Sequence, residues 1–419
     1  MKVLVVGGGG REHTLVWKIS QSPQVDKIYC APGNGGIAGI AECIDINVMD
    51  FKKLIAFAKE NKVELTIVGP DDPLVGGIVD AFEAEGLKIF GPNKAAAMIE
   101  GSKVFSKDLM KKYAIPTAAY EVFENSKEAI GYLKNTSYPI VVKAEGLALG
   151  KGVIIAQSYD EAVSAVQEIM EDKAFGEAGN RIVIEEFLVG QEISVLSFVD
   201  GTTVVPMVSA QDHKRALDYD QGLNTGGMGT FSPSRIYTPE LAAYCMEHIF
   251  KPTMQAMNQE GRKFKGILYF GIILTEDGPK VLEYNARFGD PETQVVLPRL
   301  KTDLIDIFNA VIDEKLADSD VEWEDNAAVC VVMASGGYPQ KYQTGYLIEG
   351  IRDAEYMPEV TVFHAGTKIA DGKIITAGGR VLGITAVGSS LNEAIKTAYE
   401  GVQKISFRGA HYRKDIGIK

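Results

Sequence analysis

The sequence predicts a chain of mixed α/β and α+β class, with an N-terminal doubly wound parallel-sheet domain, a two-lobed core and a small C-terminal α+β domain. Three observations support this prediction. Short apolar runs alternate with helical patterns up to Pro92, hairpin-forming strands fill the middle of the chain, and a charged linker precedes a last group of strands and a helix. The length of 419 residues is also too great for a single hydrophobic core.

The N-terminal domain begins with a short buried strand, a glycine turn and a helix, in the stretch KVLVVGGGGREHTLVWKI. Helical patterns follow at Phe51–Glu60 and after Pro73. The remaining apolar runs of this region are Lys27–Ala31, Leu65–Gly69 and Lys88–Gly91. Because strands that alternate with helices form parallel sheets, we expect a doubly wound sheet here.

The core is predicted from a change of pattern at Thr117. Two strands joined by glycines, PIVVKAEG and GKGVIIA, precede a helix at Tyr159–Met170 and a further strand, RIVIEEFL. These elements predict a small α+β lobe. Strands recur at Glu192–Val199 and Val204–Ser209, and ILYFGIIL pairs with PKVLEYNAR across a turn at Thr275–Gly278.

The C-terminal domain follows a helix at Leu304–Glu314 and a charged linker near Trp323. Its predicted elements are strands at Ala327–Met333 and Arg380–Ala386 and a closing helix at Leu391–Ile405.

Composition excludes several classes of protein. With 43 basic and 56 acidic residues the net charge is -13, which repels nucleic acid and anionic membranes. No apolar run is long enough for a membrane span or a signal peptide, so a cytoplasmic protein is expected. The four cysteines form no C-x-x-C pair and the five histidines show no H-E-x-x-H spacing, so neither a zinc site nor a disulfide framework is indicated.

The first glycine loop, Gly7–Gly10, stands where the N-terminus of a helix presents free N–H groups to an anion. A dinucleotide site would require G-x-G-x-x-G, but Glu12 occupies the position of the third glycine. The pattern therefore favours a phosphate over a dinucleotide. The alternative is a glycine turn that simply reverses the chain.

The second glycine loop, AEGLALGKG, lies between two strands and lacks the spacing of a P-loop. Gly146, Gly150 and Gly152 surround Lys151, and Lys143 ends the preceding strand. A mobile flap of this kind could lower N–H groups and a lysine over phosphates. A hairpin tip without function is the alternative.

Two further polar stretches fit a nucleotide-dependent enzyme. Glu185–Leu188 joins a strand to a connecting segment, where backbone groups and an apolar face could meet an adenine ring. Asp212–Arg215 and Asn224–Gly229 combine charged groups with a pliable turn. Exposed carboxylates on an edge strand and a solvated run of charge are the alternatives.

The stretch VLEYNARFGDPETQ places chemical side chains at every second position of a strand. Glu283 and Asn285 offer oxygen ligands for Mg²⁺ on one face, and Arg287 follows on the same face, able to bind a carboxylate or phosphate through two contacts. The apolar side chains of the opposite face are Leu282, Tyr284 and Ala286. A packed strand with one salt-bridged face in water is the alternative.

Taken together, these motifs resemble the phosphoribosylamine–glycine ligase family, also called glycinamide ribonucleotide synthetase, of the ATP-grasp superfamily. The resemblance rests on GGREH, APGN, GLALGKG, QDHKR, NTGGMG and RFGDPET, and it runs from Lys2 to Gly417. Because the chain ends at Lys419, we expect none of the fused synthetase domains of multifunctional relatives.

The resemblance implies ATP-dependent ligation of glycine to 5-phosphoribosylamine through a glycyl phosphate intermediate, in de novo purine biosynthesis. The products would be glycinamide ribonucleotide, ADP and phosphate. It further implies a monomer that acts on small molecules, binds neither nucleic acid nor membrane, and transiently contacts the enzyme that supplies phosphoribosylamine. The implied domains are a substrate-binding domain over residues 1–100, an ATP-grasp core over 101–323 with a flexible lobe at about 115–190, and a C-terminal domain over 324–419.

The resemblance also assigns roles to individual residues. Those that would bind ATP are Lys103, Lys143, Gly150, Gly152, Glu185, Glu186, Phe187, Leu188 and Glu192. Those that would hold Mg²⁺ or Mn²⁺ are Glu283 and Asn285. Those that would face phosphoribosylamine are Gly8, Gly9, Gly10, Asn34, Gly69, Pro70 and Asp71. Those near glycine and the transferred phosphoryl group are Asp212, Lys214, Arg287 and Gly289, and the residues expected to act in catalysis are Arg287, Lys143, Lys214 and Asp212.

The sequence departs from the family pattern at a few positions. Gly8 stands where the family has asparagine, Asp71 where it has glutamate, Leu149 where it has alanine and Ala286 where it has cysteine or another small residue. Three rival functions remain: another ATP-grasp carboxylate–amine ligase of purine metabolism, which should lack the Asp-His-Lys-Arg signature, a dinucleotide-dependent oxidoreductase, and a nucleotide sensor without catalysis.

Overall fold

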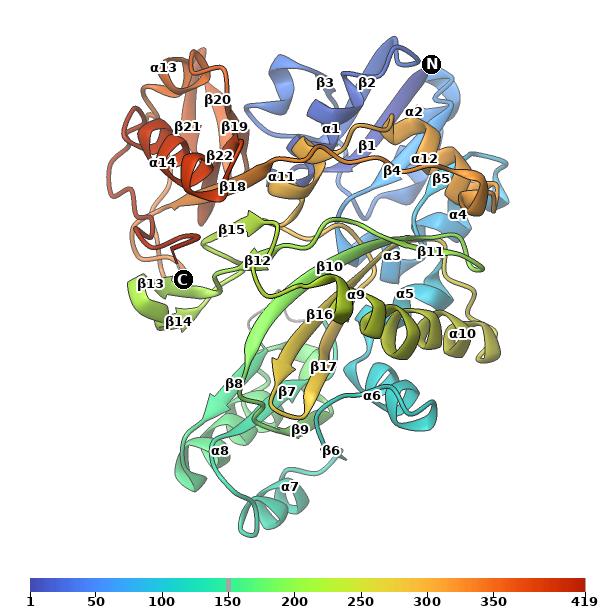
Figure 1. Cartoon of the computed structure of the whole chain (residues 1–419), viewed down its shortest axis with the longest axis vertical. Coiled ribbons are helices and arrows are strands. Elements are labelled where there is room, and N and C mark those ends of the chain that lie inside the picture. The colour runs from blue at the N-terminus through green and yellow to red at the C-terminus, as the bar shows by residue number, and fades with distance from the viewer. Residues whose placement is uncertain (148–151, 419) are drawn as a thin grey trace.

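The computed structural model describes residues 1–147 and 152–418. The N-terminal and C-terminal regions lie side by side at the top of Figure 1, and a small lobe hangs below the central part of the chain. No helix in the described part of the chain is long and apolar enough to cross a membrane.

The N-terminal region is a five-stranded parallel sheet in the order β3-β2-β1-β4-β5, as predicted for a doubly wound domain. Its strands are β1 (Lys2–Gly7), β2 (Lys27–Pro32), β3 (Glu42–Cys43), β4 (Leu65–Val68) and β5 (Ile89–Phe90). Its helices are α1 (Gly10–Ile19), α2 (Phe51–Asn61), α3 (Asp71–Gly76), α4 (Ile78–Ala84) and α5 (Lys94–Gly101). The central strands β1 and β4 are buried throughout their apolar runs, which explains why they show no alternation of polar residues.

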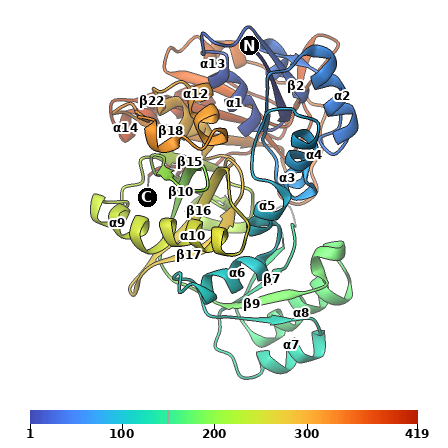
Figure 2. The same ribbon diagram turned by 90° about the vertical axis from the view of Figure 1, so that its right-hand side faces the viewer.

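The lobe is a four-stranded antiparallel sheet in the order β6-β9-β7-β8. Its strands are β6 (Tyr120–Phe123), β7 (Ile140–Ala144), β8 (Val153–Ala156) and β9 (Ile182–Glu186), and its helices are α7 (Ser126–Leu133) and α8 (Tyr159–Val166). The helix expected to reach Met170 continues beyond Val166 as a single π-helical turn, Gln167–Glu171. Helix α6 (Lys103–Lys112) leads from the N-terminal region into the lobe (Figure 2).

One face of the lobe sheet packs on its helices, and the other face points toward the core. Ile140, Val142 and Ile184 belong to a cluster with α7 and α8. Because side chains alternate along a strand, Val141, Lys143 and Glu185 lie on the opposite face.

The core sheet has the antiparallel order β11-β10-β16-β17. Its strands are β10 (Gln191–Val199), β11 (Val204–Pro206), β16 (Gly266–Thr275) and β17 (Gly278–Asn285), and the helices beside it are α9 (Pro239–Cys245) and α10 (Lys251–Gln259). The expected hairpin is therefore present, with its turn at Glu276 and Asp277. Figure 1 shows this β16–β17 hairpin reaching down toward the lobe.

The prediction that Leu282 shares the apolar face of β17 is wrong. Gly271 pairs with Glu283, but the next residue of β16, Ile272, pairs with Val281, so Leu282 is an extra residue in a β-bulge. The bulge shifts the alternation by one position. Val281 and Tyr284 face the core, whereas Leu282 lines the same cleft as Glu283.

The C-terminal region shares a sheet with the core, in the order β12-β15-β18-β22-β19. The strands are β12 (Gln211–Asp212), β15 (Gly229–Ser232), β18 (Ala327–Ala334), β19 (Val360–His364) and β22 (Arg380–Gly388). The other elements are the hairpins β13 (Arg215–Leu217) with β14 (Gln221–Asn224) and β20 (Thr367–Ala370) with β21 (Lys373–Thr376), and the helices α11 (Thr293–Val296), α12 (Leu304–Ile312), α13 (Ile351–Glu355) and α14 (Leu391–Val402). Strand β15, which follows the NTGGMG motif, therefore pairs directly with the C-terminal strand β18, and β12, which begins the QDHKR motif, pairs with β15.

A pair of buried histidines joins the N-terminal and C-terminal regions. The backbone N–H of His364 donates to Nδ1 of His13 over 2.7 Å, and Nδ1 of His364 lies 3.0 Å from the Thr367 hydroxyl. Burial lowers the pKa of His13 to about 3, with a further contribution from His364, and burial lowers the pKa of His364 to about 4. Both imidazoles are therefore neutral near neutral pH.

We expect this junction to make the fold sensitive to acid. Because both pKa values lie below the ordinary 6.5, the stabilisation is complete above pH 6.5 and is lost as the pH falls from 6.5 toward 4. In that window the free energy of unfolding should fall by about 1.4 kcal/mol per histidine for each pH unit. The variant His13→Gln keeps an acceptor for His364, so its melting temperature should fall less steeply between pH 6.5 and pH 4.5 than that of the unchanged protein. His248→Gln, at an exposed position, is the control; equal slopes for all three proteins would contradict the expectation.

Candidate active site

A cleft of about 920 Å³ lies between the lobe and the core sheet. Its walls come from β7, β8 and β9 of the lobe, from the connecting residues 186–192, from α6, and from β17. A volume of this size can enclose a nucleotide together with a small second substrate.

A cluster of lysines around one carboxylate forms the lobe side of the cleft. Nζ of Lys143 lies 2.9 Å from both oxygens of Glu185, and Nζ of Lys107 lies 2.9 Å from Glu185 Oε2. Nearby, Nζ of Lys103 donates to the carbonyl of Gly146 over 2.9 Å. Burial lowers the pKa of Lys107 to about 8 even though Glu185 raises it. The cluster carries more positive than negative charge, so it is suited to a polyanion.

An apolar slot adjoins these charges. It is lined by Val141, Val153, Ile155, Phe187, Leu188, Ile273 and Leu282. Beside it, β9 runs into the connecting segment, where Glu186 accepts a hydrogen bond from the backbone N–H of Ala119 over 2.9 Å. An apolar slot next to strand-edge backbone groups is a suitable place for a flat heteroaromatic base.

The oxygens of β17 face the lysines across the cleft. Glu283 Oε1 lies 3.5 Å from Nζ of Lys214, which also contacts Glu192 over 3.0 Å. The charge of Lys214 lowers the pKa of Glu283 against the opposing effect of burial. Burial alone would lower the pKa of Lys214, but Glu192 and Glu283 raise it well above its usual value. Glu283 is therefore held as a carboxylate, the form that binds a hard cation.

Arg287 is fixed at the end of the same strand. Its Nη2 lies 2.8 Å from Glu100 Oε1 and donates to Asn285 Oδ1 over 3.3 Å, while the other Glu100 oxygen accepts from the Ala286 N–H over 2.6 Å. Burial raises the pKa of Glu100 to about 7 despite the opposing charge of Arg287, and Asp71 raises it further. Nε of Arg287 has no hydrogen-bond partner among the described residues. The guanidinium is thus held in place by Glu100 and Asn285 at the wall of the cleft.

A buried network of oxygens lies behind Lys214. Glu292 Oε1 accepts hydrogen bonds from the hydroxyls of Ser194 and Tyr269, each over 3.1 Å. Burial raises the pKa of Asp212 well above its usual value, and the charge of Glu292 raises it further. Asp212 also accepts from the His213 N–H over 2.6 Å.

The first glycine loop is filled by the protein's own carboxylate. The N–H of Gly9 donates to Glu12 Oε2 over 2.5 Å, and Nε of Arg11 donates to Glu12 Oε1 over 2.6 Å. A Cβ atom on Gly69 would approach Glu12 Oε1 to 2.1 Å. Glu12 therefore occupies the space beside the helix N-terminus that a dinucleotide pyrophosphate would need, which argues against the oxidoreductase alternative.

The Asn34 side chain uses its amide hydrogen bonds to hold this loop in place. Its Nδ2 donates to the carbonyls of Gly8 and His364 over 3.0 and 2.8 Å, and its Oδ1 accepts from the N–H groups of Gly36 and Ile37. A Cβ atom on Gly8 would meet the Gly33 carbonyl oxygen at 2.4 Å. A side chain at position 8 would therefore require the Gly33 backbone to shift.

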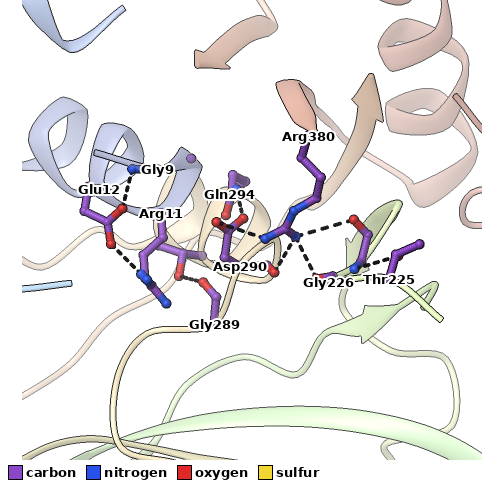
Figure 3. Close-up of polar contacts among 12 residues, drawn as sticks. Gly9, Arg11, Glu12, Thr225, Gly226, Gly289, Asp290, Gln294 and Arg380 are labelled. Carbon is purple, nitrogen blue, oxygen red and sulfur yellow. Dashed lines mark hydrogen bonds and ion pairs between the residues drawn. The ribbon is translucent and has the colours of Figure 1, made fainter. Parts of the chain in front are cut away.

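Figure 3 shows Arg380, from the C-terminal strand β22, joining two signature loops. Its Nη1 donates to the carbonyls of Gly226 and Asp290 over 2.6 and 2.7 Å, and its Nη2 lies 3.4 Å from Asp290 Oδ2. Asp290 in turn accepts from Nε2 of Gln294 over 2.7 Å. One guanidinium therefore fixes the NTGGMG turn against the RFGDPET loop.

The cleft gathers most of the predicted residues. Those that line it are Asp71, Lys103, Lys143, Gly152, Glu185, Glu186, Phe187, Leu188, Glu192, Asp212, Lys214, Glu283, Asn285 and Arg287. Gly9 and Gly10 lie next to the cleft residue Asp290. A Cβ atom added to Gly9 or Gly10 would lie 3.6 or 3.5 Å from an oxygen of the Asp290 carboxylate. Among the described residues, the lining does not include Gly8, Asn34, Gly69, Pro70 or Gly289. Gly150, Leu149 and Lys151 lie outside the described residues.

Several cleft residues were missed by the sequence analysis: Glu100, Lys107, Tyr269, Leu282, Asp290 and Glu292. A signal existed for Lys107, because it stands four residues after Lys103 and residues at this spacing share one face of a helix. Glu100 and Tyr269 come from stretches in which the sequence analysis found no chemical pattern. Leu282, Asp290 and Glu292 lie in VLEYNARFGDPETQ, but Leu282 was predicted on the opposite face and the two carboxylates follow the end of the strand, where the alternation no longer places them.

An antiparallel lobe, a core hairpin and a charged cleft between them define the ATP-grasp class of nucleotide-dependent enzymes. Within this class the chain belongs to the phosphoribosylglycinamide synthetase family. The N domain of that family matches residues 1–100, its ATP-grasp (A) domain residues 101–293, and its C domain residues 328–419. The match therefore includes all three regions of the fold.

Relatives and solved structures agree with this assignment. A phosphoribosylamine–glycine ligase of Caldanaerobacter subterraneus subsp. tengcongensis is 52% identical over 416 residues, covering 99% of each chain. One of Vibrio parahaemolyticus is 50% identical over 422 residues, covering 100% of this chain and 98% of the relative. The crystal structure of the phosphoribosylamine–glycine ligase of Thermotoga maritima superimposes with a TM-score of 0.85 at 35% identity, covering 99% of this chain and 100% of that one. The biotin carboxylase domain of the Hydrogenobacter thermophilus 2-oxoglutarate carboxylase shares the fold, with a TM-score of 0.73 at 16% identity, over 98% of this chain and 91% of that one.

We expect the contacts of Arg380 to stabilise the NTGGMG turn. In Arg380→Ala the NTGGMG turn loses its donors, so its amide hydrogens should exchange about tenfold faster or more, while Arg380→Lys should give an intermediate rate because lysine lacks the two-pronged geometry. Hydrogen-exchange mass spectrometry of peptides covering residues 224–229 would measure this. Arg408→Ala, at an exposed position of the C-terminal region, is the control, and unchanged protection in Arg380→Ala would refute the assignment.

Proposed function

We propose that this chain catalyses the ATP-dependent ligation of glycine to 5-phosphoribosylamine, the phosphoribosylamine–glycine ligase reaction of purine biosynthesis, which releases ADP and phosphate. The observation that carries the proposal is that the lysine cluster, the β17 oxygens and Arg287 all line one cleft. Relatives that match nearly the whole chain at about half identity bear the name of this reaction. The rival ligases of purine metabolism should lack the Asp-His-Lys-Arg motif, which this chain has at Asp212–Arg215.

The nucleotide would lie along the lobe side of the cleft. The apolar slot near Phe187 and Leu188 would hold the adenine ring, with Glu186 and Glu192 beside it. Lys103, Lys143 and the glycine loop that ends at Gly152 would neutralise the phosphates, since phosphoryl transfer depends on positioning and charge neutralisation rather than on a protein nucleophile.

Glu283 and Asn285 fit the requirements of a Mg²⁺ or Mn²⁺ site. They are hard oxygen donors at neighbouring cleft positions, and Lys214 keeps Glu283 ionised. No group of three His, Cys, Asp or Glu residues that could hold a metal occurs in the described part of the chain. A bound ion would supply charge neutralisation for the nucleotide phosphates, which would complete its coordination.

The chemistry requires activation of glycine, because a carboxylate does not react with an amine at neutral pH. Transfer of the γ-phosphoryl group would give glycyl phosphate, which the amine of phosphoribosylamine would then attack with loss of phosphate. Arg287, which lines the cleft, would stabilise the negative charge on the tetrahedral intermediate through its guanidinium. Asp212 and Lys214, which line the cleft, would orient glycine and the departing phosphoryl group, with the Gly289 backbone contributing from behind the lining.

The substrate amine would approach from the N-terminal region. Asp71 lines the cleft next to Glu100 and Arg287, and Gly9 and Gly10 border it through Asp290. Gly8, Asn34, Gly69 and Pro70 would act by shaping the loop behind these residues. The domain limits at residues 100 and 323, the monomeric state, the cytoplasmic location and contact with the enzyme that supplies phosphoribosylamine stay predictions.

Removal of one positioned charge should abolish most of the activity. Glu283→Gln and Arg287→Ala should each lower turnover by about a hundredfold or more, since each takes away an electrostatic contact to the reacting groups. Phosphate release would measure turnover, and thermal melting would verify that the variants fold. Glu276→Gln, on the exposed turn of the same hairpin, is the matched control, and near-normal turnover in the first two variants would remove their assigned roles.

The acyl phosphate mechanism predicts a strict dependence on substrates. Full-rate phosphate release should require ATP, glycine and phosphoribosylamine together, and hydroxylamine should trap a glycine-derived hydroxamate. Phosphoribosylamine is unstable, so it would be generated in the assay by a coupled enzyme. ATP consumption that is unchanged when glycine is withheld would count against glycine as the acyl donor.

A further inference from the structure

Two lysines contact one buried carboxylate at the edge of the cleft. Glu185 of β9 is 2% exposed, and it contacts Lys143 of β7 and Lys107 of α6 at 2.9 Å each. Lys107 is also 2% exposed. Nothing in the proposed chemistry uses Lys107, so its burial beside another cation needs an explanation.

The two ammonium groups are held differently. Nζ of Lys107 donates a second hydrogen bond to the Thr117 hydroxyl over 2.8 Å, and that hydroxyl donates to the carbonyl of Val281 on β17 over 2.7 Å. Lys107 is thus anchored to the core hairpin as well as to Glu185. For Lys143, the described residues provide one ionic partner, Glu185. Of the two lysines, Lys143 is the one that can leave without breaking another contact.

Movement of Lys143 away from Glu185 would be unfavourable in free energy if Glu185 had no other partner. A buried carboxylate without a counter-charge is strongly destabilised, because the interior cannot replace the water that it has lost. Lys107 removes this obstacle, since it stays within contact distance of Glu185 Oε2 when Lys143 moves.

We propose that Lys107 is a positioning residue that acts as the permanent counter-charge of Glu185, so that Lys143 is free to exchange Glu185 for the phosphates of a bound nucleotide. This inference rests on the proposed function, because it assumes that the cleft binds ATP. It assigns to Lys107 an effect on phosphate binding that it exerts without touching the nucleotide.

The test is to measure the binding of two ligands to Lys107→Met by calorimetry: the non-hydrolysable ATP analogue AMP-PNP with Mg²⁺, and adenosine. In this variant Lys143 must remain on Glu185, so AMP-PNP should bind about tenfold more weakly or worse, the loss of one charge-assisted contact. Adenosine has no phosphates, and its affinity should change by less than about twofold. Lys111→Met, on the exposed side of the same helix, is the matched control and should match the unchanged protein with both ligands.

A double-variant comparison separates this role from a general effect on folding. When Glu185→Gln removes the carboxylate, no counter-charge is needed, so adding Lys107→Met should cause no further loss of AMP-PNP affinity. Lys107→Arg, which keeps the charge, should retain most of the affinity. Thermal melting would verify that each of these variants is folded, so that a loss of affinity is not a loss of structure.

The outcomes distinguish the inference from the proposed function. Two results would overturn the inference: an equal loss of AMP-PNP affinity from Lys107→Met whether or not Glu185→Gln is also present, or equal losses for AMP-PNP and adenosine. If the unchanged protein binds no AMP-PNP, the proposed function itself fails. Tight binding to the unchanged protein and to Lys107→Met alike would refute the role of Lys107 and leave the proposed function standing.

Discussion

The cleft depends on the neutralisation of charges that the fold has withdrawn from bulk water. Glu185 is held between two lysines and Arg287 is paired with Glu100, all with mostly buried side chains, while Lys214 lies between the partly exposed Glu192 and Glu283. In each case a charge from one element is compensated by a partner from another, because an unpaired buried charge would oppose folding. The same arrangement leaves the lobe side rich in cations and the β17 side rich in oxygens, as a site for a phosphate–metal complex requires.

The antiparallel sheet β12-β15-β18-β22-β19 explains how distant segments form one site. Strand β12 includes the first residue of the Asp-His-Lys-Arg motif and pairs with β15, which follows the glycine turn and pairs with β18 from the last part of the chain. Arg380 extends this connection, since it reaches from β22 to Gly226 and Asp290 (Figure 3). The C-terminal region therefore does more than cover the core, because it sets the position of loops that border the cleft.

Much of the fold could be predicted because its elements carry strong local patterns. The apolar runs of the first sheet, the glycine-joined hairpin of the lobe and the β16–β17 pair were predicted close to their observed bounds. Strands β12, β15 and β19 were missed. The first two are short and rich in glycine or polar residues, so β15 is ordered by its pairing with β18, and β12 by its pairing with β15, rather than by their own propensity.

The sequence by itself determined the class of the domains, the membership of a ligase family and the gathering of lysines, oxygens and an arginine into one candidate site. Tertiary structure decided the bulge that turns Leu282 into the cleft, the placement of Glu12 inside the glycine loop, and the partners of Lys107 and Arg380. The physical reason is that periodicity describes which side chains share a face of one element, whereas register and packing between elements decide what that face meets.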